Sequence, residues 1–194
     1  MLSSVRHTPY LVLLINVYGA LAAGQGTSAP VERMLSTLSS YARSGNPPGQ
    51  RVAFEFPEAM VNAYLTMSLA QQPRPGIERA TVKLLPANRM TVQADLNFDA
   101  MAERFSKKTA ESLKGVHAVT IELHFTVQEG KVRIEWDRFL VGDKPLAAPL
   151  SAEVVQVLGA MQPEKFNTAS AIPLPYGLKR LSTSAGVLSA DTLR

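Results

Sequence analysis

The residue types that most often bind metals or act as nucleophiles are scarce in this sequence. The chain has three histidines and no cysteine. His7 lies in an apolar N-terminal segment, and His117 follows Gly115 in a predicted turn. His124 falls on the polar side of a predicted strand. Because no histidine has a partner at metal-ligand spacing, we predict no metal site and interpret His117 and His124 as surface residues.

Carboxylates are the remaining candidates for acid–base chemistry. Those that could line up across neighbouring predicted strands are Asp95, Glu122, Glu135 and Asp137. Paired carboxylates can act as general acid and base, but acidic side chains on the wet face of a sheet also keep it soluble, and we favour that interpretation. The sequence has no G-x-S-x-G elbow, no G-x-x-x-x-G-K-[ST] loop and no G-x-G-x-x-G turn at a strand end. We predict a protein that is not an enzyme and needs no cofactor, with an exported hydrolase as the least favoured hypothesis.

The N-terminal segment has the pattern of an export signal. Arg6 and His7 form a short basic start, and residues 10–23 are largely apolar. Residues 20–22 read Ala-Leu-Ala, the small-x-small pattern that signal peptidase recognises. The alternative is a retained anchor, but the apolar stretch is shorter than the ~20 residues of a spanning helix. The predicted organisation is a signal peptide over residues 1–23, a flexible leader over 24–30 and a single domain over 31–194.

Export would place the mature domain in the periplasm or outside the cell. The formal net charge is +4, from 20 Lys and Arg against 16 Asp and Glu. The adjacent basic pairs, at 107–108 and 179–180, are not interleaved with aromatic residues. We therefore predict no nucleic-acid partner. Transient contact with anionic lipid headgroups stays open, and a protein partner is not specified.

Hydrophobic periodicity predicts four helices and several long strands. Helices are expected over 31–42, from Pro57 to residue 69, over 99–114 and over 151–161. Strands with period-two alternation are expected over 52–56, 80–84, 92–98, 119–127 and 132–141, followed by a small hairpin over 178–183 and 187–190. Turns are expected at 86–88 and at Glu129-Gly130.

The strand over 132–141 changes parity partway along its length. Arg138 falls on the apolar parity, whereas Phe139 and Val141 fall on the other one. An extra residue near Asp137, forming a β-bulge, would explain this change. Together the pattern predicts an α+β fold, in which a curved antiparallel sheet of about six strands packs on or wraps around amphipathic helices.

The most distinctive stretch is residues 52–65, which read VAFEFPEAMVNAYL. A strand that runs directly into a helix marked by Glu58, Asn62, Tyr64 and Leu65 resembles the opening of several bacterial envelope proteins of the tubular lipid-binding (TULIP) superfamily. The pattern of long amphipathic strands extends the resemblance to about residue 141. The chain lacks the lipid-attachment cysteine that some envelope members carry. The resemblance implies a curved sheet around a helix, an apolar groove for a lipid or other hydrophobic molecule, and no catalytic residues.

The apolar side chains that such a groove would use come from the first strand and helix and from the long strands. They are Phe54, Phe56, Val61, Tyr64, Leu65, Leu96, Phe98, Leu123, Phe125, Ile134 and Trp136. Each of them also fits an ordinary core position. Glu58 and Asn62 share a helix face, where they could meet a polar ligand head or bond backbone groups at a strand end; we favour the second reading.

Two function classes follow from this pattern. The leading prediction is an exported, non-catalytic protein of the bacterial envelope that binds a lipid or other hydrophobic small molecule. The alternative is an envelope interaction or scaffold protein with a fully packed core and a protein partner. A ligand-sized void in the core would favour the first, and a stable co-purifying protein would favour the second.

Overall fold

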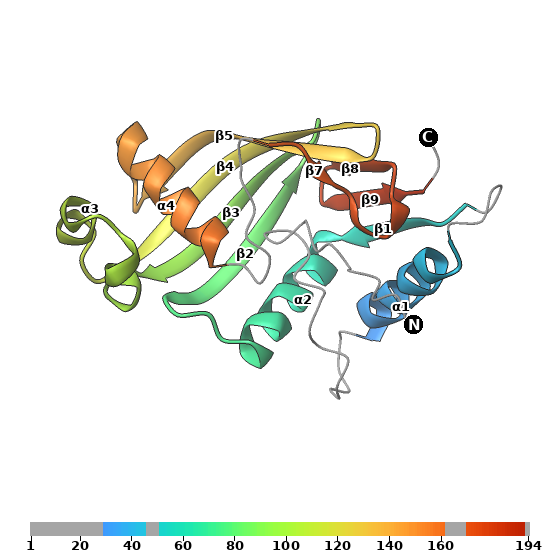
Figure 1. The fold of residues 1–194 in the computed structure, drawn as a ribbon, viewed down its shortest axis with the longest axis horizontal. Helices are drawn as coiled ribbons and strands as arrows, with labels where there is room; N and C mark the ends of the chain where they lie inside the picture. Colours follow the sequence, from blue (N-terminus) through green and yellow to red (C-terminus); the bar gives the residue numbers. More distant parts are fainter. Residues whose placement is uncertain (1–28, 46–50, 162–169, 193–194) are drawn as a thin grey trace, which may run out of the picture.

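The computed structural model describes residues 29–45, 51–161 and 170–192. The predicted signal peptide and most of the predicted leader therefore lie outside the described residues. Two antiparallel sheets form the framework, one of six strands and one of three (Figure 1). In the larger sheet the strand order is β2-β3-β4-β5-β6, and β7 pairs with β5 outside this path. The predicted α+β fold with a sheet of about six antiparallel strands is confirmed.

The larger sheet is built mainly from two long hairpins. Its strands are β2 (Ile77–Leu85), β3 (Arg89–Asn97), β4 (Val116–Gln128), β5 (Lys131–Val141), β6 (Lys144–Pro145) and β7 (Ile172–Pro173). The β2–β3 turn has a positive φ at Ala87 and Asn88, and the β4–β5 turn has one at Glu129 and Gly130. Both predicted turns are confirmed, and the long, one-sided strands they join supply the main apolar face.

The smaller sheet joins the beginning of the domain to its end. Its order is β1 (Ala53–Pro57), β9 (Val187–Asp191), β8 (Arg180–Ser184). The sequence predicted these strands but not that β1 pairs with β9, because so distant a pairing leaves no local signal. Arg51 reinforces the pairing, since its Nη2 lies 2.7 Å from Oδ2 of Asp191.

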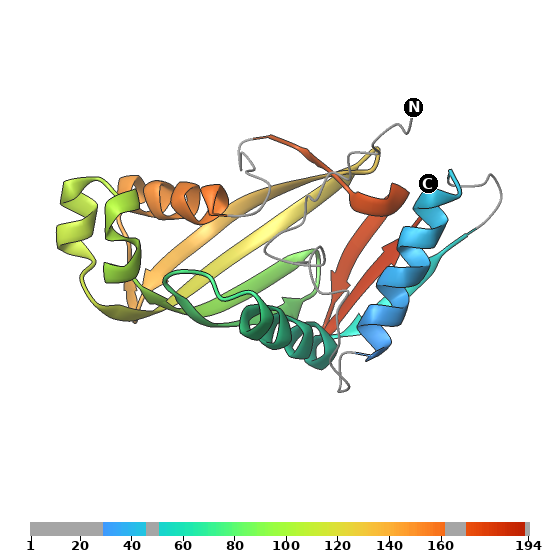
Figure 2. The same cartoon turned by 60° about the horizontal axis from the view of Figure 1, so that its bottom comes forward.

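Helices lie along the two edges of the larger sheet and beside the smaller one (Figure 2). They are α1 (Ala29–Arg43), α2 (Glu58–Gln71), η1 (Asp99–Arg104), α3 (Lys107–Ser112), α4 (Ala148–Ala160) and η2 (Pro175–Gly177). In the figure α2 follows β2, α4 lies at the opposite side of the sheet, and α1 flanks the smaller sheet. Within the described ranges no helix is both long and apolar enough to span a membrane.

The helix predicted over residues 99–114 is wrong as a single element. Phe105 interrupts it with an extended backbone (φ −99, ψ 157) and packs on Phe98 with the ring centroids 5.7 Å apart. Ser106 then caps α3, because its side chain accepts a hydrogen bond from the N–H of Thr109. Burial of Phe105, together with a new N-cap, breaks the helix in two. The apolar residues Met101 and Leu113 are also buried, so this segment is part of the core.

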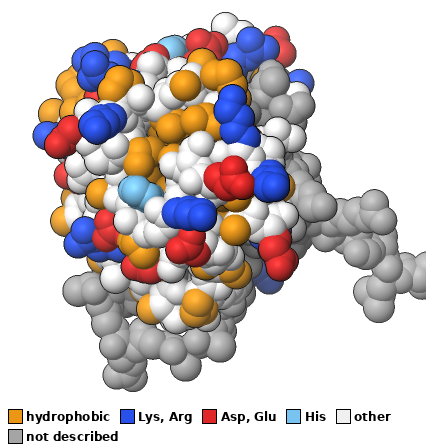
Figure 3. Space-filling view, turned by 90° about the vertical axis from the view of Figure 1, so that its left-hand side faces the viewer, with side chains coloured by type: hydrophobic (Ala, Val, Ile, Leu, Met, Phe, Trp, Pro, Cys, Tyr) orange, Lys and Arg blue, Asp and Glu red, His pale blue; other side chains and the backbone are white. Residues whose placement is uncertain are grey.

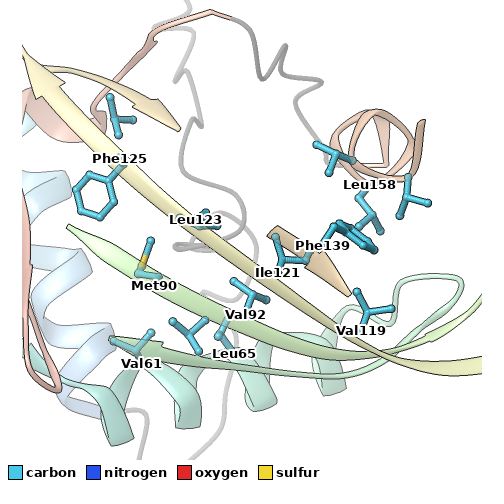
Figure 4. Packing of buried hydrophobic residues seen from close by; sticks show 14 of the residues in the cluster. Val61, Leu65, Met90, Val92, Val119, Ile121, Leu123, Phe125, Phe139 and Leu158 are labelled. Carbon is cyan, nitrogen blue, oxygen red and sulfur yellow. The ribbon is translucent and has the colours of Figure 1, made fainter. Parts of the chain in front are cut away.

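The core is the apolar face of the larger sheet with the helices that cover it (Figure 4). Alternate residues of β3 and β4, such as Val92, Ile121 and Leu123, project to this face, where they meet Leu65 of α2 and other helix residues. Near β5, Leu158 of α4 lies close to Phe139 in the same cluster. The two helices therefore cover one face from opposite sides.

The predicted β-bulge near Asp137 is confirmed. Leu123 pairs with Trp136 and the preceding Glu122 pairs with Arg138, so Asp137 is the extra residue of β5. The bulge shifts the parity of the strand by one. As a result Trp136 and Phe139, three residues apart, both belong to the side of β5 that faces the core.

Candidate hydrophobic binding site

The two polar residues of the distinctive stretch bind the backbone of β2. The Asn62 side chain donates to the carbonyl oxygen of Val82 at 2.8 Å and accepts from the N–H of Val82 at 2.7 Å. One turn earlier, Oε2 of Glu58 accepts from the N–H of Leu84 at 2.6 Å. Glu58 and Asn62 are four residues apart on one face of α2, and the residues they bind, Leu84 and Val82, are two apart on β2. The interpretation of Glu58 and Asn62 as partners of strand backbone is therefore confirmed.

The turn between β8 and β9 adds two more hydrogen bonds to this group. The N–H of Gly186 donates to the carbonyl oxygen of Leu84 at 3.0 Å, and the carbonyl of Gly186 accepts from the N–H of Glu58 at 2.8 Å. Glu58, Asn62 and Gly186, which we call the β2 clamp, occupy the hydrogen-bonding groups of Val82 and Leu84. These polar side chains are committed to the fold and are not available to a ligand head.

Most of the apolar residues predicted for a groove lie in the core. The members of the buried cluster are Phe56, Val61, Leu65, Leu96, Phe98, Leu123 and Phe125. Tyr64 is also buried. Phe54, Ile134 and Trp136 are half-buried and pack against the cluster, Phe54 in the smaller sheet and the other two in β5. The predicted set thus separates into eight buried residues, Phe54 in the smaller sheet, and the pair Ile134 and Trp136 on β5.

A hollow with mostly apolar walls lies between β5 and α4. Its volume is about 460 Å³ and it is open to solvent. The lining residues are Trp136, Asp137, Arg138 and Phe139 from β5, Pro145 and Leu146 from the following segment, and Ala148, Ser151, Ala152 and Val155 from α4. We call this hollow the β5–α4 groove. The bulge at Asp137 creates its floor, because it turns Trp136 and Phe139 toward the same side.

The α4 wall of the groove is made of small side chains. Ala148, Ala152 and Val155 recur at helical spacing, which leaves room between the helix and the strand. The helix start is fixed by the N–H of Leu146, which donates to the carbonyl oxygen of Phe139 at 2.9 Å. The hydroxyl of Ser151 donates to the carbonyl of Leu146 at 3.1 Å. The segment that leads into α4 is therefore bonded to both walls of the groove.

On its far side α4 is bound to α3 through Glu153. Its carboxylate accepts hydrogen bonds from the N–H and the hydroxyl of Ser106 and from the hydroxyl of Thr109. These bonds, chiefly the one from the Ser106 N–H, hold the pKa of Glu153 below its ordinary value. The charged carboxylate thus helps to set the position of the helix that forms one wall of the groove.

The indole N–H of Trp136, at the base of the groove, has an unusual environment. This N–H is shielded from water and has no hydrogen-bond acceptor in the described part of the chain. Buried donors without an acceptor are rare in folded proteins, and each one costs about 1–3 kcal/mol. The Trp136 N–H therefore marks a place where an acceptor is missing.

The carboxylates considered for acid–base chemistry lie on the opposite, polar face of the sheet, and each has a basic neighbour. Nδ1 of His124 lies 2.8 Å from Asp137, and its Nε2 lies 3.3 Å from Glu135. The other two pairs are Arg79 with Asp95 at 3.0 Å and Arg138 with Glu122 at 4.0 Å. Both ring nitrogens of His124 are thus engaged. No group of three potential metal ligands occurs among the described residues.

A second hollow, of about 790 Å³, lies beside the β4–β5 turn. Its lining residues are Thr126, Gln128, Glu129, Lys131, Arg133, Glu135 and Ala171. Six of these seven side chains are polar or charged. This hollow has little apolar surface to offer a hydrophobic ligand.

Sequence reasoning identified the floor of the β5–α4 groove only in part. Trp136 was among the predicted binding residues, whereas Phe139, Leu146, Ala152 and Val155 were not. The parity change at Phe139 was a signal, since it placed Phe139 on the same side as Trp136. The facing surface of α4 gave no signal, because small residues on a helix are common in any sequence.

No model of a known protein family matches this chain, and the search of curated proteins found no match either. The resemblance of residues 52–65 to the TULIP superfamily stays a prediction. The best indication of function is therefore the geometry of the β5–α4 groove.

Proposed function

We propose that this chain is an exported, non-catalytic protein that binds a hydrophobic small molecule, such as the acyl chain of an envelope lipid, in the β5–α4 groove. The observation that carries the proposal is the groove itself, with its apolar floor of Trp136 and Phe139 and its wall of small α4 residues. Its volume of about 460 Å³ lies within the range of about 300–1,000 Å³ that is typical of small-molecule sites.

The energetics of the groove favour a flexible chain over a polar molecule. Each methylene group that moves from water to an apolar wall contributes about 0.8 kcal/mol. The polar groups of the β2 clamp are occupied by backbone, so recognition falls to apolar contact at the other side of the sheet. A periplasmic or secreted location, following the predicted signal peptide over 1–23, would bring the mature domain close to envelope lipids.

The single tryptophan of the chain makes this proposal directly testable. Because Trp136 lines the groove, its fluorescence is a direct probe of occupancy there. Titration of the domain from residue 25 onward with a bromine-labelled fatty acid should quench the emission, whereas the unlabelled acid should shift its wavelength. Native mass spectrometry of protein prepared from a bacterial periplasm should show a bound mass that solvent extraction releases.

A matched pair of variants separates binding in the groove from binding elsewhere. Ala152→Phe adds a ring to a residue that lines the groove, and it should lower affinity at least about 10-fold through steric exclusion. Ala160→Phe makes the same change on an exposed residue of α4 that is not part of the lining. If neither fatty acid affects Trp136 emission, or if both variants behave alike, the proposal is wrong.

A packed interaction protein is the second candidate, and the buried cluster favours it. Seven of the residues predicted for a ligand groove are in closely packed core positions instead. A protein partner would then bind an exposed surface rather than a lipid entering the molecule. A lipid-free mass together with a stable co-purifying protein would favour this candidate over the first.

A further inference from the structure

We infer that the ligand of the β5–α4 groove carries an uncharged oxygen acceptor, such as an ester carbonyl or a hydroxyl, in the part of the molecule that lies between β5 and α4. This inference rests on the proposed function, and it adds one polar group to the apolar chain. It is argued from the indole N–H of Trp136 and from the position of the two charged lining residues, Asp137 and Arg138.

Trp136 supplies a donor that has no acceptor in the free protein. Its N–H is the buried side-chain polar atom without a partner in the described part of the chain. The residue as a whole is half-buried and lines the groove. A ligand oxygen bonded to this N–H would satisfy it, whereas a plain hydrocarbon would leave it unpaired. The N–H therefore favours a ligand with an acceptor on its chain.

Ser151 is the other lining residue with an uncharged polar side chain, and its proton is already in use. Its hydroxyl donates to the carbonyl oxygen of Leu146 at 3.1 Å and lies 3.2 Å from that of Ala147. Because a hydroxyl has one proton, the Ser151 oxygen can only accept a hydrogen bond from a ligand. An alcohol can therefore bond to both Ser151 and Trp136, and an ester carbonyl to Trp136 alone. Both ligands share the acceptor that Trp136 lacks.

The charged groups of the lining residues lie on the other face of the sheet. The Asp137 carboxylate is 2.8 Å from Nδ1 of His124, and the Arg138 guanidinium is 4.0 Å from Glu122. These contacts are on the polar face, whereas Trp136 is on the side of β5 that faces the core. A charged group of the ligand next to Trp136 would lose its water and gain no ion partner there. The acceptor at Trp136 is therefore uncharged.

The surface at the end of the molecule near α3 and α4 agrees with an uncharged ligand (Figure 3). Apolar side chains are exposed there in a band, and Lys and Arg side chains are mixed with Asp and Glu side chains around it. A mixture of both signs has no strong net attraction for an anion or for a cation. Apolar contact and the Trp136 donor are then the means of recognition.

The single tryptophan gives the decisive experiment a direct readout, because its indole N–H has one signal in the NMR spectrum of the isotope-labelled protein. The N–H is shielded from water, so an acceptor reaches it only when neighbouring side chains move apart. Binding should therefore change the signal, and a new hydrogen bond should move the indole proton downfield.

The unaltered protein is titrated with four ligands of similar length, all as monomers at about pH 8, where a carboxylic acid is ionised. They are hexane, hexanol, methyl pentanoate and hexanoate. We expect hexanol and methyl pentanoate to bind with a downfield shift of the indole proton. Hexane should bind without a downfield shift, and hexanoate should bind more weakly than the ester.

Variants measured by calorimetry then assign the preference to one donor. Trp136→Phe removes the N–H and keeps an apolar ring, and it should weaken binding of methyl pentanoate about 5- to 10-fold more than binding of hexane. Hexane is the matched control, since it reports the loss of ring contact alone. Arg138→Gln should leave the affinities for the ester and for hexanoate unchanged, because its guanidinium is on the other face of the sheet.

Each outcome decides between the two proposals. Equal losses of ester and hexane affinity in Trp136→Phe, or a downfield shift with hexane, would overturn the acceptor and leave the hydrophobic groove in place. Tighter binding of hexanoate than of the ester would overturn its lack of charge. A downfield shift with hexanol alone supports a hydroxyl as the acceptor, and one with the ester alone supports a carbonyl. If none of the four ligands binds, the proposed function itself is wrong.

Discussion

The two borders of the larger sheet are completed in different ways. Along β2, the Asn62 side chain and the neighbouring groups of the β2 clamp occupy the backbone of Val82 and Leu84. Along β5, β7 pairs near the start of the strand and β6 near its end. Between them, on the side of β5 away from β4, no strand of the described ranges pairs with residues 133–139, and the β5–α4 groove lies next to this stretch.

The two borders differ in how completely the fold itself fills and satisfies them. At the β2 border, side chains satisfy main-chain donors and acceptors, so that surface is complete without anything else. At the β5 border, a bulge, small helix residues and the unpaired N–H of Trp136 leave a site that is not complete. If this contrast is correct, substitutions at the β2 border should act on stability, and substitutions at the groove should act on binding.

The largest stability effect should come from removal of the clamp. Asn62→Ala leaves both the N–H and the carbonyl of Val82, a buried residue, without partners, and it should lower the free energy of unfolding by about 2–4 kcal/mol. Urea unfolding monitored by circular dichroism measures this loss. Asn97→Ala is the matched control, since its bonds are longer and exposed, and it should cost less than about 1 kcal/mol. Equal losses for the two variants would show that the clamp is not important for stability.

A smaller effect is expected at the turn that begins the β5 border. Gly130 has φ +72, and a Cβ there would lie 3.1 Å from the carbonyl oxygen of Leu178, so Gly130→Ala should cost about 1–3 kcal/mol. Gly142→Ala has a similar backbone angle, φ +57, but no atom within 4 Å of its Cβ. Gly142→Ala, the control, should therefore lose only the cost of placing alanine at a positive φ, about 1 kcal/mol. Calorimetric melting temperatures of the two variants should therefore differ; identical values would contradict the crowding by Leu178.

A gain of stability is expected at the turn next to the β2 border. Ala87 has φ +60, a strained angle for alanine that glycine accepts freely. Ala87→Gly should raise the free energy of unfolding by about 0.5 kcal/mol, because relief of strain slightly exceeds the added freedom of the unfolded chain. Ala185→Gly, in the β8–β9 turn and without a positive φ, should lower stability instead. The same sign for both variants in chemical unfolding would refute this account.

The smallest effect is expected only at acidic pH, and it concerns the stability contributed by Glu153 of α4. Hydrogen bonds from Ser106 and Thr109 lower the pKa of Glu153 in the folded protein, so its stabilisation is present above about 4.5, the ordinary value, and is lost as pH falls through the lower folded value. Glu153→Gln should therefore flatten the fall of the urea midpoint on acidification. Glu111→Gln, on an exposed residue of α3, should follow the unaltered protein. If the urea midpoint of Glu153→Gln falls on acidification as much as that of the unaltered protein, this carboxylate does not stabilise the position of α4.

Local patterns in the sequence predicted those features that have a local cause. The alternation of Val119 to Val127 defined a long strand, the shift at Phe139 gave the bulge, and the four-residue spacing of Glu58 and Asn62 indicated partners on a neighbouring strand. Features that depend on distant contacts were missed. The break at Phe105 arises from its burial against Phe98, which periodicity alone does not contain.

The candidate site was the least predictable part for the same reason. A groove forms where two surfaces do not fit closely, and here the two surfaces are the bulged strand β5 and the helix α4. These elements are close in sequence, but the position of α4 is set by hydrogen bonds to Phe139 and Ser106. The eleven apolar residues predicted for it were correct as apolar positions, but most of them had neighbours to fill the space around them. Only the geometry of α4 shows which of them keep an open side.

The side-chain amide of Asn62 takes the place of a further strand and so protects the sheet from pairing with other chains. A bare strand border is a template on which other chains add and aggregate. Asn62 ends the sheet at β2, because it uses the donor and acceptor that an incoming strand would need. On β5 the bulge and the charged residues Arg133 and Glu135 hinder such addition by another route. Both borders of the larger sheet therefore resist the addition of a further strand.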